Sequence, residues 1–491
     1  MKKVLLVYPG YVVREQPLNI LYISAAVKAS GHASLLFEIT PYRKRPLWGD
    51  PYRIMRRAFE KALMAFRPDV VGFSVMSVNM KIALTLARSV RRLRPEALVL
   101  FGGIHPTIAP GETLDEDAVD AVCIGEGEES LVELLAALDG GREHTSIAGL
   151  WVKSNGRVFR NPVRPLIQDI DRLPFPDRAA LSPERLQAEL YGVNILSSRG
   201  CPFPCAYCQN EFLMDLYRGR GPFVRYRSLE NLFAEIDEVI RTCHPSRLSF
   251  SDESFTLNAR RLEDFCREYP KRYSLPFLCQ TRPDLVDETT MRRLREAGCD
   301  FVNMAVEAGN PAIRNDVLRR NISDEQIVQA FALARRHGLR SGSFNMIGLP
   351  GETLATVWDT INLNAVIQPD RIMCTVYMPF KGTALGEKCL EEGWLEHPVD
   401  DSEVYYTEVT IRHPAIPART LLGYQGFFDY YVRLPKRLHR FVHALRYLYQ
   451  LLPPATHRLP PPLRIIREAV INFVYRLKRF LPSPGFFMKS R

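Results

Sequence analysis

Short runs of apolar and β-branched residues alternate with amphipathic stretches over most of this chain of 491 residues. In the first part of the chain, the strand-like runs are residues 4–8, 33–38, 69–74, 97–101 and 121–124. The spacing of apolar residues predicts helices over 17–29 and 79–93 between them. Strands that alternate with helices of this length form parallel sheets with helices on both faces. The pattern therefore predicts an α/β fold that begins with a doubly wound parallel sheet of the Rossmann or flavodoxin type.

The alternation resumes near residue 194 with longer units. Its six strand-like runs are residues 194–198, 247–251, 276–280, 301–306, 341–347 and 371–377. Helices are expected between them, for example over 228–242 with Ser228 as the N-cap, and over 323–337 with Ser323 and Gln326 as a capping box. Six successive βα units predict a (β/α)6 partial TIM barrel, with functional side chains at the carboxyl ends of the strands. The expected regions are a parallel-sheet domain (1–140), a linker with a hairpin around Asn155-Gly156 (141–190), a barrel (191–395) and a basic helical C-terminal region (396–491).

The formal charge of +10 is unevenly distributed. From Arg412 to Arg491 there are 15 Lys and Arg against two acidic residues, whereas residues 1–411 carry 50 against 53. Residues 4–8 are too short for the apolar part of a signal peptide, and no run of 18 apolar residues predicts a membrane span. Most of the ten cysteines stand singly in apolar surroundings, as is typical of reduced thiols. We therefore expect a near-neutral cytoplasmic body with a basic tail.

Helical spacing of apolar residues continues into the basic tail, at Leu434, Leu438, Phe441, Leu445, Leu448 and Leu452, and a second amphipathic stretch follows around 464–479. An apolar stripe beside arginines is typical of a helix that lies on an anionic membrane surface. A helical lid over the barrel, with a solvated basic face, explains the pattern equally well. Residues 412–491 are thus a candidate peripheral membrane contact at the inner face of the membrane. No RNA-binding motif accompanies the charge, so nucleic acid is not an expected partner.

Three cysteines depart from the scattered pattern, because Cys201, Cys205 and Cys208 have the spacing C-x3-C-x2-C directly after the first barrel strand. A loop with this spacing can present three thiolates to three irons of a [4Fe–4S] cluster and leave the fourth iron open. A zinc knuckle needs a fourth ligand, and no Cys or His follows closely to supply it. Zinc binding and cysteines without a ligand remain the alternatives.

The cysteine motif, with the aromatic Tyr207 before its last cysteine, resembles that of the radical S-adenosylmethionine (SAM) superfamily. The resemblance implies that SAM binds the open iron and is cleaved to a 5′-deoxyadenosyl radical. It also implies that Tyr207 is a cofactor-binding residue and that Asp252 and Glu253 contact the methionine part of SAM. Glu307 would bind the ribose, and the segment around Gly348 would pack near the adenine. Arg282 and Arg314 are candidate partners for a carboxylate, and surface ion pairs are the alternative for both.

Ligands of doubly wound sheets bind in the loops after the strand carboxyl ends, which here follow Tyr8, Ser74, Phe101 and Ile124. A parallel α/β domain before such a barrel, with the segments 67–74, 101–107 and 119–128, resembles the cobalamin-binding (B12) domain of B12-dependent radical SAM enzymes. The candidate cofactor-binding residues are Ser74, Gly102, Gly103, His105, Gly125, Glu126 and Gly127. There is no D-x-H-x-x-G motif, so His105 is either a cobalt ligand or a loop residue bonded to its surroundings.

The resemblance implies a cobalamin-dependent methyltransferase that acts on an unactivated carbon, with one SAM supplying the methyl group through cobalamin and another supplying the radical. Cobalamin-dependent cyclisation or rearrangement without methyl transfer is the alternative, and a non-catalytic iron–sulfur or corrinoid sensor is a third. Methylthiotransferases carry further cluster cysteines in their first domain, where this chain has only Cys123. The expected partners are a small-molecule or lipid substrate and a reductant of the flavodoxin or ferredoxin type. The sequence assigns no catalytic residue.

Overall fold

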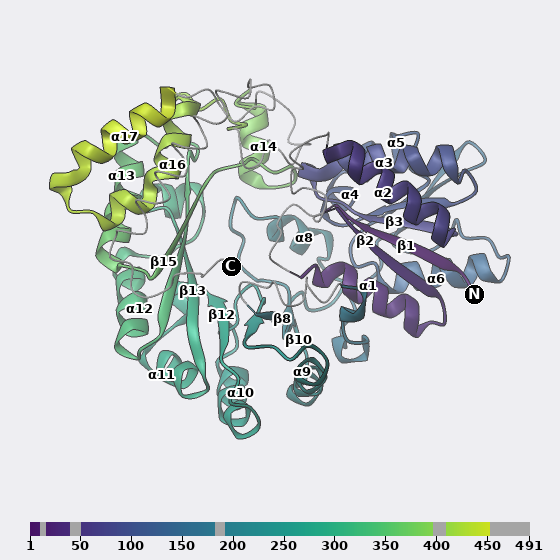
Figure 1. Cartoon of the computed structure of the whole chain (residues 1–491), viewed down its shortest axis with the longest axis horizontal. Helices are drawn as coiled ribbons and strands as arrows, with labels where there is room; N and C mark the ends of the chain where they lie inside the picture. Colours follow the sequence, from purple (N-terminus) through teal and green to yellow (C-terminus); the bar gives the residue numbers. More distant parts are fainter. Residues whose placement is uncertain (10–15, 40–50, 182–191, 396–408, 452–491) are drawn as a thin grey trace.

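The computed structural model describes residues 1–9, 16–39, 51–181, 192–395 and 409–451 (Figure 1). Its first sheet has seven strands in the order β2-β1-β3-β4-β5-β6-β7. They are β1 (Lys3–Tyr8), β2 (Ala33–Glu38), β3 (Val70–Ser74), β4 (Leu98–Gly102), β5 (Ala121–Cys123), β6 (Leu150–Ser154) and β7 (Arg157–Arg160). The first five strands pair in parallel, which confirms the predicted parallel sheet.

Helices cover both faces of this sheet. On one side lie α1 (Leu18–Ala29) and α6 (Glu128–Asp139), and on the other α2 (Pro51–Phe66) and α3 (Met80–Leu93). Alternate side chains of β1 enter the two cores, since Val4 and Leu6 pack on one side and Leu5 and Val7 on the other. This alternation is the expected consequence of the two-residue period of a strand. Two short helices, α4 (Ile104–Ile108) and α5 (Pro110–Asp115), follow β4.

The hairpin around Asn155-Gly156 forms, but it is part of the first sheet and not of a separate linker. Strand β6 pairs antiparallel with β5, and β7 pairs antiparallel with β6. The first sheet therefore extends to Arg160, beyond the boundary expected at residue 140.

The second sheet contains six parallel strands in the order β15-β14-β13-β12-β11-β8. They are β8 (Val193–Ile195), β11 (Leu248–Phe250), β12 (Phe277–Thr281), β13 (Cys299–Glu307), β14 (Arg340–Ile347) and β15 (Arg371–Val376). Figure 1 shows these strands along an arc, with the helices on its outer side. The edge strands β8 and β15 do not pair with each other, so the sheet stays open. The strand predicted over 194–198 is divided, because residues 198–199 instead pair with a separate short strand.

The helices of this second unit are α8 (Asn210–Leu216), α9 (Leu229–Cys243), α10 (Ala259–Arg272), α11 (Glu288–Glu296), α12 (Asp324–Arg336), α13 (Leu354–Ile367) and α14 (Ala384–Glu391). A small antiparallel ribbon consists of β9 (Ser198–Arg199) and β10 (Arg225–Tyr226). Single helical turns occur at Ser77–Asn79, Ile170–Arg172, Arg178–Ala180, Pro283–Leu285, Ile313–Val317 and Lys436–Leu438. The predicted caps are confirmed: Ser228 accepts a hydrogen bond at the start of α9, and Ser323 and Gln326 form a capping box on α12.

Two neighbouring residues of the connecting segment fasten the two units together. Asp177 forms an ion pair with Lys28 and accepts a hydrogen bond from Ser24, both on α1. The next residue, Arg178, is buried and donates to Glu235 of α9 at 2.6 Å.

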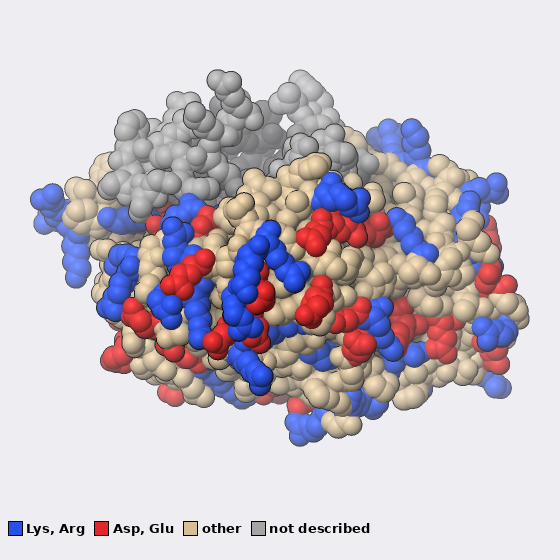
Figure 2. Space-filling view, turned by 90° about the horizontal axis from the view of Figure 1, so that it is seen from below, with Lys and Arg blue, Asp and Glu red and all other residues tan. Residues whose placement is uncertain are grey.

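On the face shown in Figure 2, basic and acidic side chains are interspersed, as expected of a body in which the charges nearly balance.

The described part of the C-terminal region forms α16 (Ala418–Arg433) and α17 (His439–Leu451). Helix α16 packs against β15 and α13 with aromatic side chains such as Phe427 and Tyr431. The helix predicted from Leu434 begins later, because the chain turns at Pro435 and α17 starts at His439. The side chains of Leu438 and Phe441 are exposed, and Leu452 lies outside the described residues. Within the described ranges, no helix combines the length and apolar character that crossing a bilayer would require. The second amphipathic stretch, 464–479, lies outside the described residues.

Candidate cofactor sites

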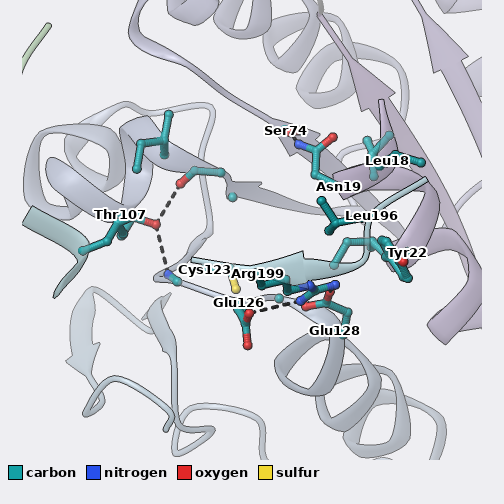
Figure 3. A pocket seen from close by; sticks show the side chains of 18 of the residues that line it. Leu18, Asn19, Tyr22, Ser74, Thr107, Cys123, Glu126, Glu128, Leu196 and Arg199 are labelled. Carbon is teal, nitrogen blue, oxygen red and sulfur yellow. Dashed lines mark hydrogen bonds and ion pairs between the residues drawn. The ribbon is translucent and has the colours of Figure 1, made fainter. Parts of the chain in front are cut away.

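A cavity of about 520 Å³ lies at the carboxyl ends of the first sheet, where this sheet faces the second unit (Figure 3). Seven of the predicted cofactor-binding residues line it, namely Ser74, Gly102, Gly103, Gly125, Glu126, Gly127 and Glu253. Its wall also contains Arg199 and Gly200, which directly precede the first cysteine of the motif. The loops of the first domain and the start of the cysteine loop therefore share one cavity.

Two glycines of this wall cannot be replaced without displacing their neighbours. Gly125 has φ +83°, and a Cβ there would lie 1.7 Å from the hydroxyl oxygen of Tyr217. Gly103 has φ +98°, and its Cβ would lie 2.8 Å from the carbonyl oxygen of Val75. Thr107 connects the two loops, because it donates to the carbonyl oxygen of Gly103 and accepts from the amide of Gly125. Glycine is required at both points because neighbouring protein atoms fill the space that a Cβ would take. The fit of a corrin ring depends instead on the cavity itself, whose lining is mainly apolar.

Glu126 belongs to an ion-pair cluster at one side of this cavity. Its carboxylate accepts hydrogen bonds from Arg225 at 2.8 and 2.9 Å, from Arg199 at 3.1 Å and from the amide of Ile167 at 3.1 Å. Burial alone would raise the pKa of Glu126, but the hydrogen bond from Arg225 and the charges of both arginines outweigh it and lower the pKa. Arg199 also donates a hydrogen bond from Nη2 to the carboxylate of Glu128 at 2.7 Å (Figure 3). Glu126 was predicted to bind the cofactor. Its carboxylate instead pairs with two arginines of the second unit and so joins the two units.

His105 does not line the cavity, although Ile104 beside it does. Its Nδ1 lies 2.9 Å from the hydroxyl oxygen of Ser77. Burial and then the charge of Lys381 lower the pKa of His105, so the ring is neutral near pH 7. Of the two interpretations of His105, these contacts match that of a loop residue bonded to its surroundings.

The cysteine loop starts at a residue that must be glycine. Gly200 has φ +93°, and a Cβ there would lie 2.4 Å from the carbonyl oxygen of Phe223. Burial raises the pKa of Cys201, and it raises that of Cys208 to about 11. The backbone amide of Cys208 donates to the carbonyl oxygen of Cys205 at 2.9 Å, so the last two cysteines lie on one tight turn.

Three thiols on one short loop form the donor set that a [4Fe–4S] cluster requires. A single metal ion needs its ligands closer together, and among the described residues no three Cys, His, Asp or Glu side chains converge in that way. The donor set of the loop, three thiols without a fourth Cys or His close behind, therefore suits a cluster.

Tyr207, Glu307 and Arg320 form a buried group beside this loop. The Tyr207 hydroxyl donates to Glu307 at 3.0 Å and accepts from Arg320 at 2.7 Å. Glu307 is the last residue of β13 and has φ +65°, a left-handed backbone conformation that residues other than glycine rarely adopt. Burial raises the pKa of Glu307, while Arg320 and Tyr207 oppose the rise. Two of the predicted SAM-binding residues, Tyr207 and Glu307, therefore lie in direct contact.

Asp252 and Glu253 are adjacent in sequence but differ in their surroundings. The carboxylate of Asp252 is fully buried and accepts hydrogen bonds from Ser197 and Ser198, so it holds the turn that precedes the cysteine loop. Glu253 instead lines the cavity and is accessible through it, although the protein around it raises its pKa by burial. Asp252 was expected to bind SAM, and its contacts instead give it a positioning role. For Glu253, contact with the methionine part of SAM stays a prediction.

The remaining candidates are also occupied by protein contacts. Gly348 does not line the cavity, and its amide donates to Glu352 at 2.6 Å. Arg314 is fully buried and donates to three backbone carbonyls and to Asp324, so neither a surface ion pair nor a ligand carboxylate explains it. Arg282 is also buried, and Asp284 occupies its guanidinium fork. Both arginines therefore differ from their predicted surface or ligand-binding roles.

Sequence reasoning missed several residues of the cavity wall, namely Tyr22, Thr107, Arg199, Tyr217 and Arg225. Arg199 could have been noted, since it stands two residues before Cys201 at the end of a predicted strand. Thr107 could also have been noted, since it ends the segment 101–107. Tyr22, Tyr217 and Arg225 lie outside the segments singled out in the sequence, and only the fold brings them to the cavity.

Comparison with known proteins agrees with this arrangement. The family model of the Radical SAM superfamily matches residues 195–363, and that of the B12 binding domain matches residues 5–135, together more than half of the chain. The chain belongs to the radical SAM superfamily and carries a B12-binding domain. It is accordingly an enzyme, and this family gives it a [4Fe–4S] cluster, SAM and cobalamin as cofactors.

Two curated relatives and one solved structure illustrate the relationship. The chain is 32% identical to Uncharacterized methyltransferase PH0819 of Pyrococcus horikoshii, over 68% of this chain and 72% of the relative. It is 26% identical to an anaerobic magnesium-protoporphyrin IX monomethyl ester cyclase of Rubrivivax gelatinosus, over 77% of this chain and 68% of that protein. The fold is similar to that of the radical SAM methyltransferase TsrM from Kitasatospora setae, with a TM-score of 0.68 and 17% identity over 97% and 99% of the two chains.

Proposed function

We propose that this enzyme is a cobalamin-dependent methyltransferase that methylates an unactivated carbon and whose second unit is a (β/α)6 partial barrel. The observation that supports the proposal is the shared cavity, whose wall combines Gly103 and Gly125 of the B12-binding domain with Gly200 and Glu253 of the radical SAM domain. When bound, the cluster and SAM supply a hydrogen-abstracting radical, and cobalamin supplies a methyl group. Both must reach the same substrate carbon, and one cavity between the two domains allows this.

The residues of the chain contribute position and exclusion of water. Arg199 and Arg225, held by Glu126, keep the two domains at a fixed distance across the cavity. Tyr217 packs against Gly125 in the cavity wall, and burial raises the pKa of its hydroxyl to about 12, so it stays protonated. A protonated, immobile phenol can orient a ligand without acting as a base near pH 7.

The test uses anaerobically reconstituted enzyme with SAM that carries a deuterated methyl group. Methyl transfer predicts S-adenosylhomocysteine together with 5′-deoxyadenosine, and label in a product that is heavier than its precursor by the labelled methyl increment. Cyclisation without methyl transfer, which the similarity to the Rubrivivax cyclase favours as the second candidate, predicts 5′-deoxyadenosine without label in the product. Absence of 5′-deoxyadenosine from the reduced enzyme contradicts both reactions and leaves a sensor.

The tail supports a further part of the proposal, a peripheral contact of this cytoplasmic enzyme with anionic membranes. On α17 and the turn before it, the side chains of Leu438, Phe441 and Tyr447 are 43%, 58% and 61% exposed. Arg437 and Arg440 lie beside them in sequence, and apolar and basic side chains on one helix suit an anionic bilayer. We expect Phe441→Glu to reduce sedimentation with phosphatidylglycerol vesicles, without changing cofactor content. Equal sedimentation of variant and wild type would contradict the contact.

Two partners complete the proposal. The substrate is a small molecule or a lipid, because the cavity wall is mainly apolar, with Leu18, Ile20, Ile104 and Leu196 among its residues. The electron for SAM cleavage comes from a flavodoxin or ferredoxin. Replacement of the chemical reductant by reduced flavodoxin should sustain formation of 5′-deoxyadenosine, and no formation would contradict this partner.

A further inference from the structure

Each sulfur of the cysteine loop has its own hydrogen-bond donor, and one donor differs from the other two. The backbone amide of Phe203 donates to Cys201, and that of Asn210 donates to Cys208. Each of these two backbone donors lies two residues after its cysteine and so belongs to the same local stretch of chain. Cys205 receives its hydrogen bond from Nη1 of Arg282, at 3.7 Å and 77 residues further along the chain. A charged side chain from another strand end therefore replaces the local backbone donor.

The guanidinium of Arg282 is fixed on its other sides. Its Nε and Nη2 donate to the two carboxylate oxygens of Asp284, both at 3.0 Å, and Nη2 also donates to the carbonyl oxygen of Arg320 at 2.8 Å. The plane lies over the ring of Phe203, 3.7 Å from its centroid. Only 7% of Arg282 is exposed. These contacts leave Nη1 to face Cys205, and they leave no free fork for the carboxylate of SAM.

The energetic consequence follows from the charge of the cluster. Reduction adds an electron, and part of that charge resides on the cysteine sulfurs. A hydrogen bond or a positive charge at a sulfur stabilises the reduced state more than the oxidised state and so raises the reduction potential. The effect is large where water is excluded, and Cys205 is the one buried cysteine of the three.

We propose that Arg282 is a positioning residue that donates to the Cys205 thiolate and raises the reduction potential of the [4Fe–4S] cluster. Asp284 holds the guanidinium in place and offsets part of its charge. The proposal depends on the cluster alone, so it stands whether the reaction is methylation or cyclisation. It also explains why a buried Arg–Asp pair lies at the carboxyl end of β12, beside the cysteine loop.

The test is a redox titration of the reconstituted full-length enzyme without SAM, followed by electron paramagnetic resonance of the reduced cluster. We expect Arg282→Met to lower the midpoint potential and Asp284→Asn to raise it, because the second change leaves the guanidinium charge uncompensated. Arg340→Met is the matched control. Arg340 pairs with Asp300 at 2.8 Å and lies over the ring of Phe301, but at the amino end of β14, the opposite end of the sheet.

The outcomes separate tuning of the cluster from general loosening of the loop. Equal potentials for wild type and Arg282→Met, at equal iron content, would overturn the proposal. So would shifts in the same direction for Arg282→Met and Asp284→Asn, or an equal shift for Arg340→Met. If Arg282→Met does not retain the cluster, Arg282→Lys is measured in its place. Its single ammonium keeps the charge but not the fork, so its potential should lie below that of wild type, and a potential at or above wild type contradicts the proposal.

Discussion

The ion-pair cluster between the two domains allows a quantitative prediction for Glu126→Gln. This change keeps the size of the side chain but removes the charge that faces Arg199 and Arg225, whose side chains are only 15% and 5% exposed. Removing one partner of a buried ion pair costs about 3–5 kcal/mol, because the remaining charge stays buried without compensation. With an m-value of about 3 kcal/mol/M, the urea midpoint of the cofactor-free protein falls by about 1–1.7 M.

Glu129→Gln provides the control for this measurement. Glu129 pairs with Arg172 and Arg164 near the same cavity, but on the surface, where such a pair contributes about 0–1 kcal/mol. Because the pKa of Glu126 is lowered in the folded protein, its contribution is present above its ordinary pKa and is lost as the pH falls through the folded value. The difference between wild type and Glu126→Gln should therefore shrink in acid. Equal midpoints for the Glu126 and Glu129 variants at pH 7 would refute the reasoning.

Three further changes have distinct expected results. Burial raises the pKa of Glu352 to about 7, so folding stability falls by about 3 kcal/mol as the pH rises from about 4.5 to about 7. Glu352→Gln should remove this loss, as measured by urea unfolding at several pH values. An unchanged pH dependence contradicts the burial argument. Gly125→Ala should displace Tyr217 and lower the amount of corrinoid that the protein retains after desalting. Gly111→Ala is the control, because its Cβ would meet no atom within 4 Å and should leave this amount unchanged. Equal retention by both variants contradicts the placement of cobalamin. Glu307→Gln should weaken SAM binding about tenfold at unchanged iron content, because a hydrogen bond to a charged group contributes about 1.5 kcal/mol. Equilibrium dialysis measures the affinity, and an unchanged affinity argues against ribose binding by Glu307.

Local sequence patterns predicted the elements that depend on local physics. The strand over 33–38 has the predicted bounds, and the capping box of Ser323 and Gln326 forms as expected. Gly103 and Gly125, predicted as cofactor-binding residues, have positive φ and line the cavity, and their role in binding stays a prediction. Each of these features is decided by a few neighbouring residues, and a sequence displays such neighbours directly.

Features that depend on the tertiary arrangement were not predictable in the same way. An acidic residue at a strand end can hold a turn or bind a ligand, and only the fold shows that Asp252 does the former while Glu253 faces the cavity. Arg314 was expected either to bind a carboxylate or to form a surface ion pair, but it is fully buried and donates to backbone carbonyls around it. The pair of Glu126 and Arg225 joins residues 99 positions apart, a separation at which charge patterns carry no information about pairing.

The central claim is that one chain holds an iron–sulfur cluster on Cys201, Cys205 and Cys208 and a corrinoid in the neighbouring cavity. The most direct test is the iron, sulfide and corrinoid content of the anaerobically reconstituted protein, compared with a variant in which all three cysteines are alanine. We predict about four irons, four sulfides and one corrinoid per wild-type chain, in keeping with one [4Fe–4S] cluster. The variant should lose the iron and sulfide and keep the corrinoid. Iron retained by the variant, or a wild-type protein that retains no corrinoid, would contradict the claim.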